Sequence, residues 1–288
     1  MKHILIIFGI LFSINMHAQY WDAGILIGVS NYQGDLAPDK VRASVGRSRG
    51  AIGLNTRYNL TPRFSFKLGA NIGRLSADDK DAVGSTIGRD LRFESKLYDL
   101  SLTTEVSLFK YDPSDPAAIW VTPYIFGGIS LFHFNPQTQY EQRWVDLRDY
   151  HTEGQGLPGY PEEYKLTQFA IPFGLGLKIN VNEEWTIGVE LGARRTFTDY
   201  LDDVSGYYPN YIALHEAYGS AAVELSNPNI NINEELPDFE PYTIQRGSSD
   251  NEDWYFIGGL TVSYNFLFKG LFSSASNTHH LGCPRFRM

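Results

Sequence analysis

Hydrophobic and polar side chains alternate with a period of two along most of this chain. In residues 98–108, Leu100 and Leu102 share an apolar face, whereas Ser101 and Thr103 lie on the opposite face. A period of two is typical of a β-strand with one apolar side. The same alternation predicts eight strands, which span residues 23–29, 50–60, 64–73, 98–108, 120–133, 168–179, 185–194 and 254–268.

The two faces of these strands favour a membrane barrel over a soluble sheet. The polar face carries mainly Gly, Ser, Thr and Asn, which fit the crowded interior of a narrow barrel. The apolar face would then meet lipid, where no strand edge can be left unpaired. We therefore predict an all-β protein, an eight-stranded antiparallel transmembrane β-barrel. A secreted β-sandwich or a lipocalin-like barrel is the alternative.

The lengths of the connections predict how the barrel is oriented. Short turns at residues 59–63, 110–118 and 180–184 alternate with long connections at about 32–48, 74–93, 134–165 and 195–253. Outer-membrane barrels have short periplasmic turns and long extracellular loops, and an even strand number places both termini in the periplasm. Trp21, Trp120 and Trp185 begin the first, fifth and seventh strands, where an interfacial aromatic girdle is expected.

The chain ends and the longest loop complete the predicted organisation. Residues 1–18 have a basic start, an apolar run and a small residue at the end, which is the pattern of a signal peptide. The barrel then spans 19–268, and 269–288 form a periplasmic tail. Within the loop 195–253, residues 210–226 have helical apolar spacing and predict a short helix, whereas the polar second half predicts a mobile segment. The connection 134–165 is expected to be irregular.

Composition excludes several classes of protein. No internal apolar run reaches the roughly 18–20 residues of a membrane helix. The single cysteine, Cys283, excludes an internal disulfide framework and a cysteine-built zinc site. The formal net charge of −9 argues against a nucleic-acid partner.

Charged residues on the polar faces predict an interior charge network. Buried charges in a narrow barrel must pair with one another. An eight-stranded barrel also has an interior that side chains just fill, so these residues should block conduction rather than line a pore. The predicted network consists of Arg57, Lys67, Asp99, Glu105, Lys178, Glu190 and Arg194.

The sequence offers little sign of catalysis or of cofactor binding. None of the histidines after the leader has a serine two residues away in a predicted strand, so a nucleophile and base would have to be brought together by the long loops. Asp199, Asp202 and Asp203 are weak candidates for a calcium site, but their spacing is not that of an EF-hand loop. A solvated or capping acidic cluster at the barrel rim is the more economical interpretation. We expect no cofactor and no enzymatic activity.

Four segments together carry a family resemblance. They are GVSNYQGDL (28–36), PYIFGGISLFHFNP (123–136), GARRTFTDYLDDVSGYY (192–208) and CPRF (283–286). With these segments the chain resembles the PorG-type outer-membrane barrels of the Bacteroidetes type IX secretion system. The run TDYLDDVS is the most specific of the shared features.

The resemblance implies a part in protein secretion. A PorG-type barrel is an integral outer-membrane component that associates with a periplasmic ring of PorK/PorN-like subunits, and it has no enzymatic activity. Outer-membrane lipids and this ring are then the expected partners. The surfaces open to the ring are the short turns and the tail, with Asp112, Asp115, Glu183, Glu184, Cys283 and Arg285 as candidate contacts. A small anchoring or adhesin-type barrel, or a lipid-modifying barrel enzyme, are the alternatives.

Overall fold

The computed structural model describes residues 20–37, 46–79, 89–113, 119–249 and 251–266. The predicted signal peptide at 1–18 and tail at 269–288 lie outside the described residues, as do Asp115, Cys283 and Arg285. Within the described ranges, no helix has the length and apolar character needed to cross a membrane.

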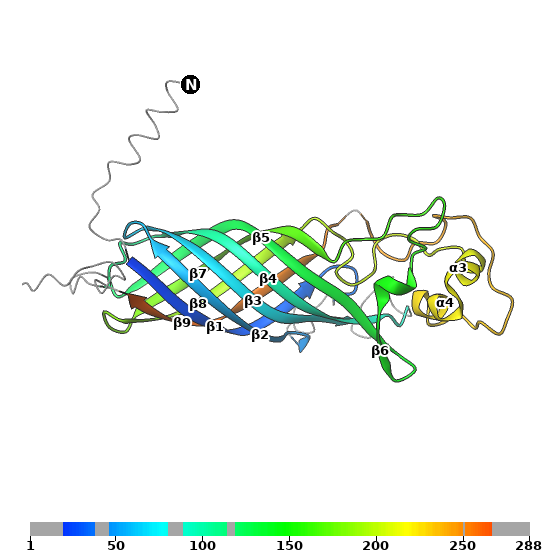
Figure 1. Cartoon of the computed structure of the whole chain (residues 1–288), viewed down its shortest axis with the longest axis horizontal. Helices are drawn as coiled ribbons and strands as arrows, with labels where there is room; N and C mark the ends of the chain where they lie inside the picture. Colours follow the sequence, from blue (N-terminus) through cyan, green and yellow to red (C-terminus); the bar gives the residue numbers. More distant parts are fainter. Residues whose placement is uncertain (1–19, 38–45, 80–88, 114–118, 250, 267–288) are drawn as a thin grey trace, which may run out of the picture.

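Eight antiparallel strands form a closed barrel, as the alternation predicts (Figure 1). Each strand pairs with its neighbour along the chain, and pairing of β1 with β9 and of β4 with β5 leaves the ring without an open edge. The eight strands of the barrel wall, its staves, are β1 (Tyr20–Gln33), β2 (Arg49–Asn59), β3 (Phe64–Asp78), β4 (Arg92–Ser107), β5 (Val121–Tyr140), β7 (Thr167–Asn180), β8 (Trp185–Thr196) and β9 (Trp254–Phe266).

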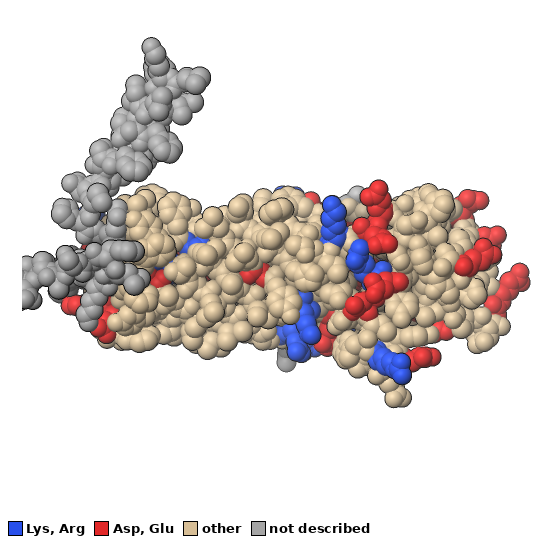
Figure 2. Space-filling view, viewed as in Figure 1, with Lys and Arg blue, Asp and Glu red and all other residues tan. Residues whose placement is uncertain are grey.

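The barrel wall is apolar on its outside. Leu54 and Leu260 are 66% and 62% exposed, and exposed aliphatic or aromatic side chains occur on every stave. In Figure 2, charged side chains on the visible face gather mainly toward the end that carries α3 and α4. A wall of this kind is stable only against lipid, because so large an exposed apolar surface would aggregate in water. The chain is therefore a membrane-spanning barrel of the outer-membrane type.

The two ends of the barrel differ as the connection lengths predict. Tyr20 pairs with Asn59, and Trp21 pairs with Phe266, so β1 begins and β9 ends beside the short β2–β3 turn. Trp21, Trp120 and Trp185 all lie at this short-turn end and are 53%, 67% and 44% exposed. Exposed tryptophans at one level suit the boundary between hydrocarbon and lipid headgroups.

Several strands continue well past the apolar band. β4 begins at Arg92 rather than near residue 98, and β5 continues to Tyr140. It then turns back as β6 (Arg143–Asp146), which pairs with β5 outside the ring and leans away from the barrel (Figure 1). The prediction that the connection 134–165 is irregular is therefore wrong for its first part, residues 134–146. Strand pairing in water does not require apolar outward positions, so the alternation fades while the backbone ladder continues.

The longest connection forms a packed cap at the other end of the barrel. It contains two helices, α3 (Tyr211–Tyr218) and α4 (Ser220–Ser226), where the sequence predicts one. Gly219 separates them with a φ of 84°, a conformation that interrupts a helix. The second half of the loop, expected to be mobile, packs its apolar side chains against this pair, through Ile230, Ile232, Leu236 and Phe239.

The lipid-facing wall makes a testable prediction. Leu102 lies outward on β4 between Leu68 and Ile129, and it is 51% exposed. We expect Leu102→Arg to lower the free energy of unfolding from liposomes by about 2–4 kcal/mol, because the charge would enter hydrocarbon. Ile244→Arg is the control, since Ile244 is 45% exposed in the loop cap. Equal effects of the two substitutions would contradict a lipid-facing barrel wall.

Candidate functional site

A cluster of buried charges crosses the barrel interior. At its centre lies the carboxylate of Glu105 on β4, which forms ion pairs with three cations. Its Oε2 lies 2.8 Å from Arg57 Nε and 2.6 Å from Lys178 Nζ, and its Oε1 lies 3.2 Å from Lys67 Nζ. These three cations come from β2, β7 and β3. Lys67 lies on the strand next to β4, whereas Arg57 and Lys178 lie two strands away on either side, so the barrel interior brings side chains of four strands together.

Two further carboxylates balance the charge. Arg57 Nη1 contacts Asp22 Oδ1 at 2.7 Å, and Lys67 Nζ contacts Glu190 Oε2. Tyr124 also donates a hydrogen bond to Glu190 Oε2 at 2.7 Å. Three cations thus face three carboxylates, Asp22, Glu105 and Glu190, and this central cluster is neutral.

The other predicted interior charges lie farther along the barrel and are satisfied differently. Asp99 accepts hydrogen bonds from Asn71 Nδ2 at 2.7 Å and from the Tyr255 hydroxyl at 2.9 Å. Arg194 Nη1 donates to the carbonyl oxygens of Gly192 and Ile257, at 2.8 and 3.2 Å. All seven predicted residues are therefore buried inside the barrel, but these two do not form the expected ion pairs with the rest.

Asp22 is the interior charge that the sequence analysis missed. It lies one residue before the strand predicted at 23–29 and has the same parity as the inward-facing Leu26. Extending the alternation by one position would have placed its carboxylate inside the barrel.

The charge cluster leaves little free space. A cavity of about 10 Å³ lies between Lys67, Phe126 and Glu190, which is room for about one water molecule. Lys67 Nζ lies 4.7 Å from the centre of the Phe126 ring. The cluster is thus a packed structural core across the barrel.

Removing the central carboxylate should destabilise the barrel. We expect Glu105→Gln to lower the free energy of unfolding by about 3–5 kcal/mol, because three buried cations would lose their shared partner. Glu184→Gln, in an exposed turn, is the control and should change stability little. Unfolding in denaturant, followed in liposomes, measures both. A Glu105→Gln protein as stable as the control would contradict the central role of this carboxylate.

A second buried cluster joins the loops at the opposite end of the barrel. Arg246 Nη1 contacts Glu153 Oε1 at 3.0 Å and donates to the backbone oxygen of Asp203. Its Nε donates to the carbonyl oxygen of Ser226 at 3.3 Å. One guanidinium group therefore connects the end of α4 to two loop segments.

The acidic run that the sequence singled out is part of this cluster. Asp202 Oδ2 accepts hydrogen bonds from the Tyr32 hydroxyl and, at 3.1 Å, from the backbone N–H of Leu36. Asp203 accepts from Thr152 and, at 2.7 Å, from the Tyr164 hydroxyl. These carboxylates hold the loops to one another and to the end of β1. In the described part of the chain, no group of three or more His, Cys, Asp or Glu side chains could hold a metal ion.

Burial shifts the titration of these loop carboxyls upward. It raises the pKa of Asp202 to about 8 and that of Asp203 to about 6. Burial likewise raises the pKa of Asp199 to about 9, with the neighbouring Asp35 and Asp202 adding to the shift. The cause is the cost of holding several negative charges in a poorly solvated cluster.

The cap should therefore loosen as the pH rises. A carboxyl whose pKa is raised in the folded state binds a proton that the opened state releases. Its stabilisation is complete below the ordinary carboxyl pKa of about 4 and declines until the folded pKa is passed. For Asp203, Asp202 and Asp199 the window runs from about pH 4 to about 6, 8 and 9.

Hydrogen-exchange protection factors for residues 199–205 would measure this effect. We expect them to fall between pH 5 and pH 8, and Asp199→Asn to make the decline shallower by up to about tenfold per pH unit. Protection factors of α3 and α4 are measured in the same samples. The comparison distinguishes opening of residues 199–205 alone from opening of the whole cap. A protection factor that stays constant from pH 5 to 8 would contradict the proton-linked cap.

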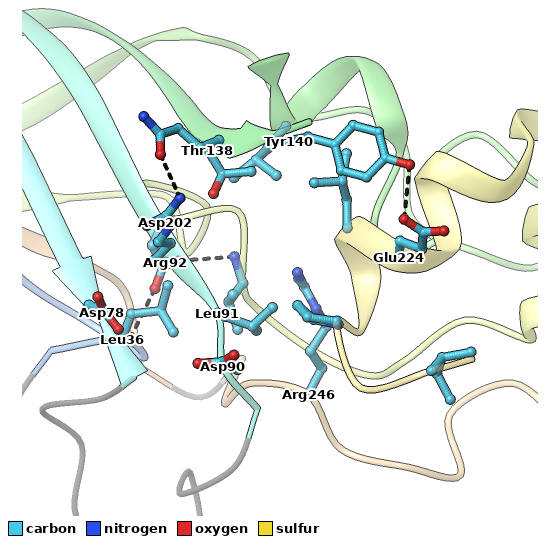
Figure 3. Close-up of a pocket in the computed structure, with 16 residues that line it drawn as sticks. Leu36, Asp78, Asp90, Leu91, Arg92, Thr138, Tyr140, Asp202, Glu224 and Arg246 are labelled. Atoms are coloured by element: carbon cyan, nitrogen blue, oxygen red, sulfur yellow. Dashed lines mark hydrogen bonds between the residues drawn. The ribbon is translucent and has the colours of Figure 1, made fainter. Parts of the chain in front are cut away.

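A cleft of about 370 Å³ opens between the extended strands and the cap (Figure 3). Tyr140 donates a hydrogen bond to Glu224 Oε2 at 2.9 Å on one side, and Arg92 donates to Gln139 Oε1 at 2.9 Å on another. Leu36 and Arg246 also contribute to its lining. Such a recess can hold a small polar or amphipathic group, but it has no arrangement of residues that points to a reaction.

The candidate partner contacts that the structure describes lie at the short-turn end. Glu183 and Glu184 are exposed in the β7–β8 turn, and Asn182 Oδ1 shapes this turn by accepting from the N–H groups of Glu184 and Trp185. Asp112 is half-buried in the β4–β5 connection at the same end. The structure thus brings three of the six predicted residues to one end of the barrel.

A family model described as Domain of unknown function (DUF6089) matches residues 1–219. No curated protein matches the sequence.

Two solved structures are similar to this chain over most of its length. Ail, the attachment invasion locus protein of Yersinia pestis, is 9% identical, with 87% of this chain and 100% of that chain covered and a TM-score of 0.40. OprG from Pseudomonas aeruginosa is 13% identical, with 86% and 96% covered and a TM-score of 0.40. Similarity at this level adds nothing to what the strand pairing itself establishes.

Proposed function

Because the chain belongs to the family described as Domain of unknown function (DUF6089), whose description leaves the activity open, we propose a function from the resemblance to PorG-type barrels together with the geometry of the barrel. The protein is a non-enzymatic outer-membrane component of the type IX secretion machinery. Its barrel docks a periplasmic ring of PorK/PorN-like subunits to the membrane, and both chain termini lie in the periplasm.

The packed, neutral barrel interior is the observation that carries this proposal. Arg57, Lys67 and Lys178 are neutralised by Asp22, Glu105 and Glu190 across the barrel. A barrel filled in this way does not serve as a general diffusion channel. Its two ends are then the surfaces available for function.

The short-turn end has the chemistry of a docking surface. Glu183 and Glu184 are exposed there on a turn held by Asn182, and Asp112 lies in the next short connection. The two adjacent glutamates of this turn fit a basic surface on the ring, since complementary charges steer association and fix its orientation. Asp115, Cys283 and Arg285 remain proposed contacts of the same surface.

The packed cap favours a second candidate function, a small anchoring or adhesin-type barrel. Arg246, Asp202 and Asp203 hold the long loops in one arrangement around a cleft. This arrangement would suit binding outside the cell. Trimming residues 227–252 should then abolish function, whereas the docking role makes the tail 269–288 the sensitive part.

Charge reversal in the β7–β8 turn tests the docking role. In a deletion strain that retains cargo in the periplasm, we expect the wild-type gene to restore secretion. We expect Glu183→Lys/Glu184→Lys to reduce co-purification of the ring subunits and cargo export at least fivefold, because like charges would then face the ring.

Glu234→Lys/Glu235→Lys is the matched control. These two glutamates are also adjacent and exposed, but they lie in the loop cap at the opposite end. Membrane levels of both variants are measured by immunoblot. Unchanged ring binding and export with Glu183→Lys/Glu184→Lys, or an equal loss with the control, would refute docking through this end.

A further inference from the structure

The outward face of β3, β4 and β5 changes character in successive steps toward the cap. An apolar and aromatic row is followed by a basic row and then by polar rows in which charges of both signs occur. In register across the three strands, the rows are Ile72–Tyr98–His133, Arg74–Lys96–Asn135 and Ser76–Glu94–Gln137. Beyond them Asp78 pairs with Arg92, whose side chain donates a hydrogen bond to Gln139.

The basic row consists of two cations without a protein partner. Arg74 and Lys96 are direct partners in the β3–β4 ladder, and both are exposed. Among the described residues, neither side chain forms an ion pair or a hydrogen bond. Like charges placed directly opposite each other destabilise a sheet. In a chain of net charge −9, such a pair indicates an external anion.

A polar groove lies next to this pair, on the side toward the cap. It has a volume of about 150 Å³, and Arg47, Arg49 and Arg92 line it together with the indole of Trp144. Trp144 is 51% exposed on β6, the strand that leans away from the barrel (Figure 1). Arg47 lies 3.6 Å from Asp78 and Arg49 lies 3.9 Å from Glu94, so the three arginines outnumber the two carboxylates.

An apolar groove lies on the barrel wall on the other side of the pair, away from the cap. It has a volume of about 590 Å³, and its lining includes Ile52, Leu54, Ile72 and Leu100. Tyr98 and His133 close the edge of this groove nearest the basic pair, with their ring centres 6.2 Å apart. Figure 2 shows Lys and Arg side chains gathered in the zone where the tan barrel wall gives way to the loop end.

We propose that this face binds a phosphorylated glycolipid of the lipid A type in the outer leaflet. Its acyl chain lies in the apolar groove, a phosphate lies between Arg74 and Lys96, and a sugar lies in the polar groove against Trp144. The three surfaces follow the order of the three parts of such a lipid. The site shares with the proposed function only the orientation that places the long loops outside the cell, and it does not depend on ring docking.

Native mass spectrometry of the protein isolated from membranes tests this site. The detergent-solubilised protein is titrated with bisphosphorylated lipid A, with lipid A stripped of both phosphates, and with phosphatidylglycerol. We expect the bisphosphorylated lipid to bind at least tenfold more tightly than either of the others. Arg74→Gln/Lys96→Gln should remove this preference, and Trp144→Ala should weaken binding of both lipid A forms by a similar factor.

Arg195→Gln is the matched control, because Arg195 is an exposed arginine on β8, across the barrel, and pairs with Glu252 at 2.9 Å. It should bind all three lipids as the wild type does. Circular dichroism confirms that each variant is folded. Equal binding of the three lipids by the wild type, or an undiminished preference in Arg74→Gln/Lys96→Gln, would overturn the site. Ring co-purification is measured separately, so failure of one proposal leaves the other standing.

Discussion

Hydrocarbon offers no partner to a backbone N–H or C=O group, and this constraint shapes the whole molecule. It forces eight strands into a ring in which β1 meets β9 and β4 meets β5. Closing the ring in turn creates a narrow interior in which side chains are buried and closely packed. A charge placed there needs a partner within the interior, and Glu105 finds cations from three other strands.

The same constraint ends where the lipid ends, and the architecture changes there. Above the apolar band the strands continue in water, where their outward positions become Arg, Lys and Glu. The loops then pack on themselves around Arg246 and the buried carboxyls of Asp202 and Asp203. This cap is held by buried hydrogen bonds and by the Arg246–Glu153 ion pair rather than by lipid. We therefore expect its stability to respond to pH, whereas that of the wall depends on the bilayer.

The proposed roles follow from this division of the molecule. A sealed barrel gives a firm anchor, and its two ends face different compartments. The short-turn end presents carboxylates on a well-defined turn, which suits a stable periplasmic assembly. The opposite rim presents Arg74 and Lys96 side by side on adjacent strands at the edge of the apolar wall, without ion-pair partners among the described residues, which suits a phosphorylated lipid. Docking and lipid binding would thus use separate surfaces of one rigid body.

The sequence by itself determined the eight strands, their two faces and the difference between the two ends. These features are local, because lipid on one side and a crowded interior on the other impose a period of two on every strand. It also identified seven interior charges, though not their partners, and it missed Asp22 just outside a predicted strand. Only the tertiary structure decided which charges meet, how far β4 and β5 extend, and that Asp202 and Asp203 join the loops. Those outcomes depend on strand register and on contacts between residues far apart in the chain, and neither leaves a periodic trace in the sequence.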